Sequence, residues 1–372
     1  ARLRASAPDV VLLVGGTDGG NAEVLLGCAD ALASARWPGP VVVAGNVEAR
    51  DHVASRLATG GTPFVLADNV VPRIGVLAPG SARAAIREMF LRHVIGGKHL
   101  SASPEFARMV RAATPDAVLE AVELLARGLD EQRPGVGDVV VVDIGGATTD
   151  VHSVMEPDPE DAGLSREVVA TPPAGRTVEG DLGMRWSAPG TVEAGLAEGL
   201  IEEQAASDPG DGLPAAAERW RTAARAREAD PGFLPGTADE RADDEALARA
   251  AAGIALRRHA GRRRAVVGEP GRHVERTGRD LRKVRLLVAS GGVLRNGGAG
   301  LAARVLSTAT GLVPGGWQLP EAPRVSVDDD CVLAAAGLLA RSHPAVAYAL
   351  LARLRDPAST TRAAARRASG EA

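Results

Sequence analysis

The stretch that most constrains the fold runs from Asp138 to Val154 and reads DVVVVDIGGATTDVHSV. Four consecutive valines, Val139 to Val142, form an apolar run that is too short for a helix and rich in β-branched side chains, so they predict a buried strand. A second strand-like run, Val151 to Val154, follows a glycine-containing segment. The sequence therefore predicts two neighbouring strands joined by a short turn.

The turn between these strands has the residue types of a phosphate and metal site. Gly145 and Gly146 would let backbone N–H groups approach phosphate oxygens without a side chain in the way. Thr148 and Thr149 add hydroxyl donors, and Asp143 can hold a water of hydrated magnesium, a hard ion that prefers oxygen ligands. The alternative is a glycine-rich β-hairpin with capping residues and no ligand.

The residues ahead of this stretch alternate between apolar runs and helical patterns. Strands are expected at Val10 to Val14, Val41 to Val43 and Thr62 to Ala67, and a helix at Ser81 to Ile95. This alternation predicts a parallel sheet covered by helices, with ligands usually bound at the carboxyl ends of the strands. The loop Gly15 to Asn21 could cradle a ligand, or Asp18 and Asn21 could cap the next helix.

Two more glycine-containing segments follow the central stretch. The first, Glu179-Gly180-Asp181, can form a turn that caps a helix. The second begins with an expected strand, Val284 to Ala289, passes through Ser290-Gly291-Gly292 and leads into an expected helix at Leu301 to Leu306. As a bare pattern, a strand, a glycine pair and a helix do not define a particular site.

Residues rich in Ala, Glu and Arg lie between these segments and are expected to form helices. Thr237 and Glu240 fit a capping box at the start of one helix. That helix is expected to end in two basic runs, Arg257-Arg258-His259 and Arg262-Arg263-Arg264. We expect them to complement the helix dipole and to form a solvated face and not a nucleic-acid site. Asp328 to Asp330 are expected to cap the small-residue helix that follows them.

The chain has 372 residues, 45% of them hydrophobic, and this predicts a globular protein with two lobes. Its formal charge of −4 argues against general nucleic-acid affinity. We expect lobes at residues 1–135 and 136–356, with a helical insertion at about 191–262 and a flexible tail at 357–372.

The sequence has no apolar run that could span a membrane and no signal peptide, so it predicts a cytoplasmic protein. In a reducing cytoplasm, Cys28 and Cys331 are expected to be buried free thiols.

The segment Val142 to Val151 resembles the second phosphate-binding loop of the actin, sugar-kinase and heat-shock-chaperone ATPase superfamily. The rest of the chain narrows this resemblance to the accessory proteins of adenosylcobalamin-dependent glutamate mutase, the glutamate mutase L family. The segments Gly15 to Asn21, Ala44-Gly45-Asn46 and Asp68 to Pro72 also resemble that family. The resemblance implies an α/β, actin-like (ribonuclease H-like) ATPase fold with two lobes, which binds ATP and magnesium.

The same resemblance implies roles for particular residues. Asp143 would be the catalytic carboxylate that positions magnesium through a water. Nucleotide-binding residues are implied at Gly145, Gly146, Ala147, Thr148, Thr149, Glu179, Gly180, Asp181, Gly291 and Gly292. The implied function is that of an ATP-dependent reactivating chaperone whose partners are subunits of an adenosylcobalamin-dependent mutase, most simply glutamate mutase, with no nucleic acid and no membrane involved.

One departure from the superfamily pattern concerns the beginning of the chain. The superfamily has a first phosphate loop of the type Asp-x-Gly-Ser/Thr within an opening hairpin, and the first residues after Ala1 contain no such motif. We therefore expect that this hairpin is missing, either because the sequence is truncated at its N-terminus or because the site is a degenerate half-site.

Two other classes of protein remain open on the sequence. A hydantoinase or oxoprolinase-type hydrolase carries a comparable Gly-Gly-x-x-Thr-Asp loop and would use ATP to open a ring, although its subunits are usually much longer. A non-catalytic actin-like assembly protein is the other alternative. The long α/β segment before the phosphate loop argues against the second of these.

Overall fold

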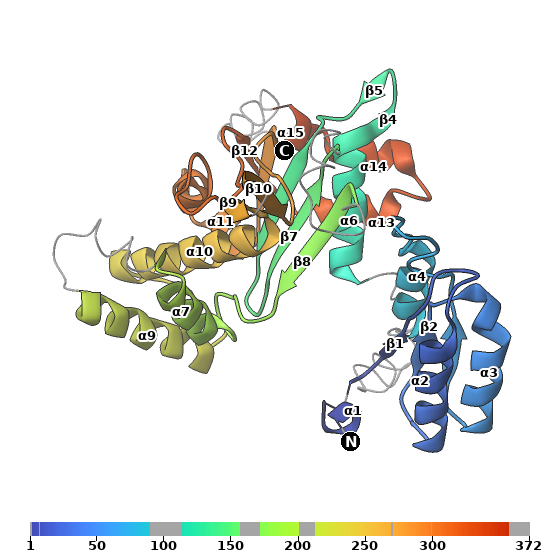
Figure 1. The fold of residues 1–372 in the computed structure, drawn as a ribbon. Coiled ribbons are helices and arrows are strands. Elements are labelled where there is room, and N and C mark those ends of the chain that lie inside the picture. The colour runs from blue at the N-terminus through green and yellow to red at the C-terminus, as the bar shows by residue number, and fades with distance from the viewer. Residues whose placement is uncertain are drawn as a thin grey trace, which may run out of the picture. The chain divides into compact units, whose positions relative to one another are not determined.

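The computed structural model describes residues 2–6, 8–89, 113–156, 172–200, 213–268, 271–298 and 300–356 (Figure 1). The chain divides into two compact units: unit 1 has residues 1–113 and 167–170, and unit 2 has residues 114–166 and 171–372. The expected lobe boundary at residues 135 and 136 lies inside unit 2, because helix α6 (Thr114–Arg127) packs on the sheet of that unit. The tail expected at 357–372 lies outside the described residues.

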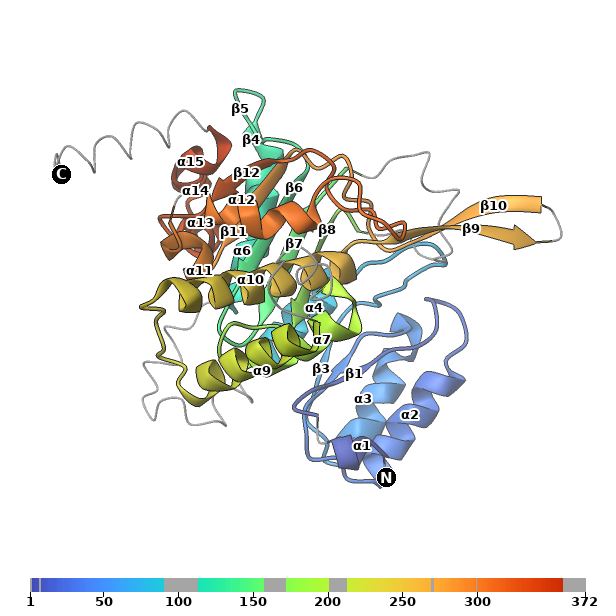
Figure 2. The same ribbon diagram turned by 90° about the vertical axis from the view of Figure 1, so that its left-hand side faces the viewer.

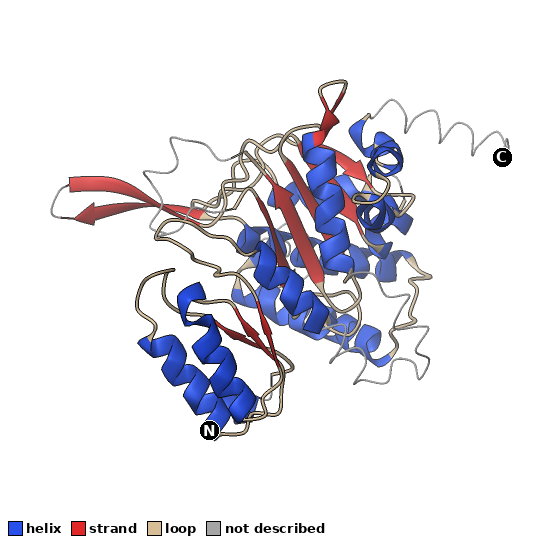
Figure 3. Cartoon of the chain, turned by 90° about the vertical axis from the view of Figure 1, so that its right-hand side faces the viewer, coloured by secondary structure: helices blue, strands red, loops and turns tan. Residues whose placement is uncertain are grey.

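Unit 1 is a small parallel sheet with helices beside it (Figure 3). Its strands are β1 (Val11–Leu13), β2 (Val41–Val43) and β3 (Phe64–Leu66), and its helices are α1 (Arg2–Ser6), α2 (Glu23–Ser34), η1 (Val47–Ala49), α3 (Arg50–Thr59) and α4 (Gly80–Met89). Val41 and Val43 pack with α2 and α3, whereas Val42 packs with α4. The three expected strands are confirmed, and so is the helix expected at Ser81 to Ile95 as far as Met89, where the described residues stop until residue 113.

Unit 2 is built on a five-stranded mixed sheet in the order β12-β11-β6-β7-β8. The strands are β6 (Val139–Ile144), β7 (Thr149–Val154), β8 (Ala174–Glu179), β11 (Leu286–Ser290) and β12 (Arg324–Val327). The first three form an antiparallel meander, and β11 and β12 continue the sheet on the other side of β6, parallel to it. The strands expected around the central glycine turn and before Gly291 are confirmed.

The four central valines are buried because helices cover both faces of this sheet (Figure 1). Val140 and Val142 belong to a core with α7 (Ala188–Ala197), α9 (Leu213–Ala229), α10 (Ala238–His259), α11 (Gly292–Asn296) and α12 (Leu301–Leu306). Val139 and Val141 belong to a second core with α6, α13 (Val332–Leu339), α14 (Pro344–Leu350) and α15 (Ala352–Arg355). An apolar run without alternation is what a strand between two helical layers requires.

The remaining described elements lie around this core. They are β4 (Gly128–Asp130), β5 (Arg133–Pro134), β9 (Arg262–Gly268), β10 (Gly271–Thr277) and η4 (Ser307–Ala309). None of the helices in the described ranges is both long enough and apolar enough to cross a membrane.

The capping box expected at the start of α10 is present. The Thr237 side chain accepts from the N–H of Glu240, and the Glu240 carboxylate accepts from the N–H of Thr237. The expectation for the other end of this helix was wrong: Arg257 and His259 are buried, and Arg258 is held by carboxylates. The second basic run, Arg262 to Arg264, belongs to β9 and not to the helix. The helix end therefore packs against the sheet instead of facing solvent.

The expectation for the cysteines was also wrong in one respect. Cys28 and Cys331 are both free, as expected, but both are exposed. In α2, the buried positions are Leu25, Ala29 and Leu32, so Cys28 lies off the buried stripe. Apolar neighbours in the sequence predicted a helix here, but they did not predict which of its faces is covered.

Helices α9 and α10 are joined by a buried ion pair. The Nε of Arg227, whose side chain is 2% exposed, donates to Asp244 Oδ1 at 2.5 Å. Its other nitrogens donate to the carbonyl oxygens of Ala223 and Glu240, each at 2.9 Å, and its guanidinium lies 4.8 Å from the ring centroid of Phe233. All three nitrogens of the guanidinium thus have acceptors, as a buried charge requires.

We predict that Arg227→Ala lowers the free energy of unfolding by about 3–5 kcal/mol, because it leaves the Asp244 carboxylate buried without its main partner. The matched control is Arg225→Ala, two residues away on the same helix, where the arginine pairs with Glu218 at the surface. That change is expected to cost at most about 1 kcal/mol. Urea unfolding of the two variants would measure the difference, and equal losses would contradict the assignment.

Two buried histidines lie on opposite faces of β7. His259 at the end of α10 contacts Ser153 Oγ through Nε2 at 2.7 Å and Thr177 Oγ1 through Nδ1 at 3.1 Å. Burial, together with the neighbouring Arg279 and His152, lowers the pKa of His259 to about 3. Burial likewise lowers the pKa of His152 to about 4. Both imidazoles are therefore neutral in the folded protein at physiological pH.

These histidines predict a loss of stability in mild acid. Unfolded histidines bind protons near pH 6.5, whereas His259 in the folded chain stays neutral down to about 3, so the unfolded state binds more protons over this window. The free energy of unfolding should fall as the pH drops below about 6.5, by up to about 1.4 kcal/mol per pH unit for each histidine. Urea unfolding between pH 7 and pH 5 should show a shallower slope for His259→Gln, but not for the exposed control His52→Gln.

Candidate functional site

The carboxyl ends of β6, β11 and β12 bring three polar residues together in unit 2. Parallel pairing places Ser290 of β11 beside Asp143 of β6, and the two side chains are hydrogen-bonded. Asp328 follows the last residue of β12, where its N–H donates to the carbonyl of Ala289 at 2.9 Å. Asp150 joins this group because antiparallel pairing sets it opposite Asp143.

The carboxyl groups of this cluster share an unfavourable electrostatic environment. Burial raises the pKa of Asp143, and the neighbouring Asp328 raises it further, while the hydrogen bond from Ser290 and the charge of Arg295 oppose the shift. Burial also raises the pKa of Asp150, to which the charge of Asp143 adds. The same cause raises the pKa of Asp328. A cation placed here would relieve both the desolvation and the mutual repulsion.

Asp328 also has a local structural role. Its carboxylate oxygens accept from the N–H groups of Val332 at 2.8 Å and Leu333 at 3.3 Å, the first two residues of α13. The capping role expected for the Asp328 to Asp330 segment is therefore confirmed for Asp328, although Cys331 stands between the cap and the helix in a left-handed conformation with φ 55°. One carboxylate thus caps a helix and faces the cluster.

The glycine turn between β6 and β7 is fixed by backbone hydrogen bonds. The N–H of Gly145 donates to Thr148 O at 2.9 Å and closes the turn. The carbonyls of Gly145 and Gly146 accept from the N–H groups of Met184 and Arg185, at 3.0 and 2.8 Å. The N–H of Gly145, which was predicted to face phosphate, is therefore bonded inside the turn. The segment with Met184 and Arg185 stabilises the turn through two more backbone hydrogen bonds.

Thr148 and Thr149 occupy different environments. Thr148 donates a hydrogen bond to Asp150, and this bond opposes the rise in the pKa of Asp150 that burial causes. Thr149 is fully buried at the start of β7, and its Oγ1 has no partner among the described residues. Asp150 Oδ1 is a second buried oxygen without a partner in the described part of the chain. Asp150 stands opposite Asp143 in the strand pair, so its unsatisfied oxygen is compatible with a ligand at this edge that completes the hydrogen bond, whereas Thr149 pairs with Ile144 and belongs to the other face of the sheet.

The segment with Glu179, Gly180 and Asp181 lies next to the glycine turn. A Cβ added at Gly183 would lie 2.6 Å from the carbonyl oxygen of Gly146, so the two backbones are in direct contact. The carboxylates of Glu179 and Asp181 are both held by Arg258 of α10 at 2.8 Å, and this hydrogen bonding lowers the pKa of Asp181. The structure therefore assigns these two carboxylates to an ion-pair network.

Gly291 and Gly292 differ in what surrounds them. Gly291 has φ +107°, and a Cβ there would lie 2.2 Å from the carbonyl oxygen of Ile144, so this glycine is needed for the packing of β11 on β6. A Cβ at Gly292, the first residue of α11, would meet no atom of the described residues within 4 Å.

Two residues that the sequence analysis did not single out border the site. Arg295 of α11 donates from Nε to Asp328 O at 3.1 Å, and its charge acts on both Asp143 and Asp328. Trp186 lies against Gly146, where a Cβ would approach its ring to 3.0 Å, and is nevertheless 61% exposed. Arg295 follows the glycine pair by one helical turn, which is a signal the sequence offered; nothing in the sequence pointed to Trp186.

The loop Gly15 to Asn21 in unit 1 is held by its own polar side chains. Asp18 Oδ1 accepts from the N–H of Val47 at 3.1 Å and from Asn69 Nδ2 at 2.8 Å. Asn21 Oδ1 accepts from the N–H of Glu23 at 2.7 Å in the first turn of α2. Asn21 thus bonds to the first turn of α2, as the capping alternative expected, whereas Asp18 bonds to Val47 and Asn69 and not to that helix.

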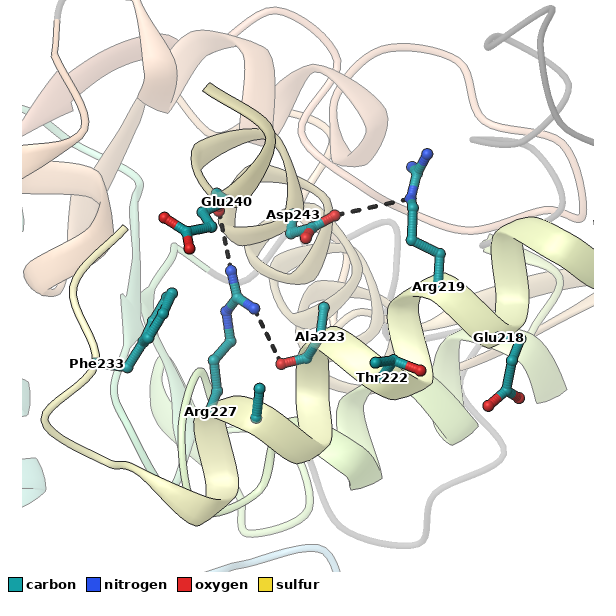
Figure 4. Close-up of a pocket in the computed structure, with 9 residues that line it drawn as sticks. Glu218, Arg219, Thr222, Ala223, Arg227, Phe233, Glu240 and Asp243 are labelled. Carbon is teal, nitrogen blue, oxygen red and sulfur yellow. Dashed lines mark hydrogen bonds and ion pairs between the residues drawn. The ribbon is translucent and has the colours of Figure 1, made fainter. Parts of the chain in front are cut away.

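Unit 2 also has a pocket between α9 and α10 with a volume of about 560 Å³ (Figure 4). It is lined by Glu218, Arg219, Thr222, Ala223, Ala226, Arg227, Phe233, Glu240 and Asp243. The Arg227 side chain that points into it already bonds to Ala223 and Glu240, and Arg219 pairs with Asp243 at 3.8 Å. None of the catalytic or nucleotide-binding residues predicted from the sequence lines this pocket, and its Arg219, Arg227 and Glu240 side chains already bond to other groups of the protein.

The fold and these strand ends define an α/β protein of two units, one of which has carboxylates and glycines at adjoining strand ends. A family model described as "MutL protein" matches residues 1–354. The chain is also similar to Protein MutL of Clostridium tetanomorphum, with 35% identity over 355 residues, which cover 92% of this chain and 72% of that protein. The chain belongs to the MutL protein family, and this confirms the family to which the sequence resemblance pointed.

The same substitution to alanine is expected to affect stability at Gly291 but not at Gly292. Gly291→Ala should lower the melting temperature strongly, because its Cβ would collide with the backbone of Ile144 at a φ that only glycine adopts easily. Gly292→Ala should leave the melting temperature within about 2 °C of wild type, since there is open space at this position. Thermal denaturation followed by circular dichroism checks both; a destabilised Gly292→Ala would mean that its surroundings are not open.

Proposed function

We propose that this protein is an ATP-dependent accessory protein that reactivates an adenosylcobalamin-dependent mutase, with glutamate mutase as the partner. The order of unit 2, an antiparallel meander followed by two parallel strands on the other side of the first, supports an actin-like (ribonuclease H-like) fold for that unit. The observation that carries the proposal is the partly buried Asp143 near the end of β6, hydrogen-bonded to Ser290 and repelled by Asp328.

The residues at this strand edge fit a hydrated magnesium ion. Mg²⁺ keeps several waters and is usually bound through one or two carboxylates plus phosphate oxygens. The described residues contain no group of three His, Cys, Asp or Glu side chains placed to hold a metal, so a closed protein cage is not the mode of binding there. Asp143 would hold the ion through a water, with Asp150 in support, and the bound ion would neutralise charge on the phosphates.

The same edge offers space and donors for a nucleotide. Thr149 Oγ1 lacks a partner among the described residues, and Gly292 leaves room at the first turn of α11. We assign the phosphates to Gly146, Ala147 and Thr148, and the adenosine to Gly291 and Gly292. Glu179, Gly180 and Asp181 would border the nucleotide through their segment's contact with Gly146, with Arg258 fixing the two carboxylates.

The link to the mutase rests on family membership and on the resemblance that led to it. A mutase that runs radical chemistry can become trapped with a damaged cobalamin in its site. A partner with nucleotide-dependent states can release that cofactor if it binds the open form of the mutase more tightly in one state than in the other. The chain's two compact units are compatible with such states.

We predict that Asp143→Asn weakens magnesium-ATP binding at least tenfold, measured by calorimetry against wild type. Partial burial raises the pKa of the Asp143 carboxyl, so the ionised form destabilises the folded state above the carboxyl's ordinary pKa. Asp143→Asn should therefore keep or raise the melting temperature, which excludes misfolding as the cause of lost binding. Asp138→Asn, at the opposite end of the same strand, is the matched control and should bind as wild type does.

The mutase step needs its own measurement. Inactivated glutamate mutase is mixed with the protein, magnesium-ATP and fresh adenosylcobalamin, and recovered activity is followed with wild type and Asp143→Asn. Recovery with wild type alone supports the proposal. Magnesium-ATP binding without any recovery would keep the nucleotide site and remove the mutase as partner, whereas absence of nucleotide binding by wild type would overturn the site itself.

A further inference from the structure

Trp186 is a large apolar side chain that stays exposed beside the glycine turn of unit 2. It is 61% exposed, yet a Cβ added at Gly146 would come within 3.0 Å of its ring atom Cζ3 and 3.2 Å of Cε3. One edge of the indole is therefore seated on the turn, and most of the remaining ring surface is accessible. A single exposed apolar side chain is common on protein surfaces. This one is distinguished by its contact with the turn to which we assigned phosphate.

The backbone on both sides of Trp186 is fixed by hydrogen bonds. The N–H of Arg185 donates to Gly146 O at 2.8 Å, and the Arg185 guanidinium donates to two backbone carbonyl oxygens at 2.7 and 3.0 Å. The hydroxyl of Ser187 donates to Gly180 O at 3.0 Å. Helix α7 begins directly after this segment and packs beside α9 and α10 (Figure 2). A rigidly placed aromatic ring loses little conformational entropy when a ligand contacts it.

The tip of the turn offers hydrogen-bond donors next to this ring. The N–H of Gly145 closes the turn, whereas the N–H groups of Gly146, Ala147 and Thr148 have no acceptor among the described residues. Consecutive unpaired N–H groups of a turn can bind anionic oxygens. An oxygen bound to the N–H of Gly146 would lie beside the Cα on which the indole rests. A phosphate at the turn would therefore have Trp186 as a neighbour.

We propose that Trp186 is a ligand-contact residue of the candidate nucleotide site, and that its indole lies against phosphates bound at the glycine turn and shields them from water. A hydrogen bond to a charged oxygen is stronger where water is displaced, because the local dielectric constant falls. The indole would supply this effect on one side of the turn. The inference rests on the proposed function, and it adds a residue that favours ligands with a phosphate chain over ligands without one.

Tryptophan fluorescence can follow this side chain in the full chain. Of the other three tryptophans, Trp37 and Trp220 are buried and Trp317 is half-buried. Acrylamide, a neutral quencher, should therefore act mainly on Trp186, and Trp186→Phe should remove most of the acrylamide-sensitive emission. Saturating magnesium-ATP or magnesium-tripolyphosphate should each lower the quenching constant of wild type by about twofold, because a ligand would cover part of the ring. Saturating adenosine should leave the constant unchanged.

Calorimetry on variants measures what the contact contributes to binding. Trp186→Ala should weaken the binding of magnesium-ATP and of magnesium-tripolyphosphate by about fivefold or more, the usual effect of truncating a contact tryptophan. Its affinity for adenosine should not change. The matched control is Leu338→Ala, which removes a half-exposed apolar side chain from α13 and should bind within about twofold of wild type. Both variants should melt within about 3 °C of wild type, because both side chains are largely in water.

The two methods together separate this inference from the proposed function. Magnesium-ATP binding by wild type in calorimetry, without any change in quenching, would overturn the contact and leave the proposed function in place. If calorimetry shows no nucleotide binding by wild type, the proposed function fails and the contact fails with it.

Two further results would assign the indole to something else. Protection from acrylamide by adenosine but not by tripolyphosphate would place the ring against the base, and the contact with phosphate would be wrong. Protection by glutamate mutase alone, with magnesium-ATP bound but ineffective, would make Trp186 a protein contact and overturn the inference as well. Protection by both phosphate ligands together with the loss of affinity in Trp186→Ala would support it.

Discussion

The parallel register between β6 and β11 is the constraint on which unit 2 depends. It sets Ser290 beside Asp143, and it carries Gly291 onto the backbone of Ile144. A slip by one residue would move every side chain of β11 to the other face of the sheet. The two helical layers would then lose their contacts with Leu287 and Val288 at the same time as the site lost its hydrogen bond. The core and the strand edge are therefore specified by one set of backbone contacts.

The carboxylates at that strand edge destabilise the folded state, and the burial of the neighbouring core offsets this loss. Asp143, Asp150 and Asp328 all have raised pKa values because burial disfavours their charge. The valines that precede Asp143 in β6 are fully buried between two helical layers, which stabilises the strand that positions it. Local conflict next to a well-packed strand is the pattern expected where binding, and not stability, selects the residues.

The sequence predicted β6 well because its evidence is local: a run of β-branched residues needs no knowledge of distant partners. The capping box of α10 was predictable for the same reason. The burial of Arg257 and His259 was not, because α10 is enclosed on several sides and its alanine-rich sequence has no single apolar stripe. The contacts of His259 with Ser153 and Thr177 join residues that are 106 and 82 positions apart, and no local pattern encodes such pairs.

Helix α10 connects the features that the sequence left separate. Arg258 holds Glu179 and Asp181, whose segment braces the glycine turn, and the helix then leads through Ala260 and Gly261 into strand β9. The candidate nucleotide edge and the pair β9–β10 thus share one element in direct contact with both. Contiguity alone does not make two sites coupled, because coupling requires an element with two arrangements that both ligands bias. Among these contacts, the exposed ion pairs of Arg258 could be rearranged at the smallest loss of stability, because ion pairs near water contribute little to the free energy of unfolding.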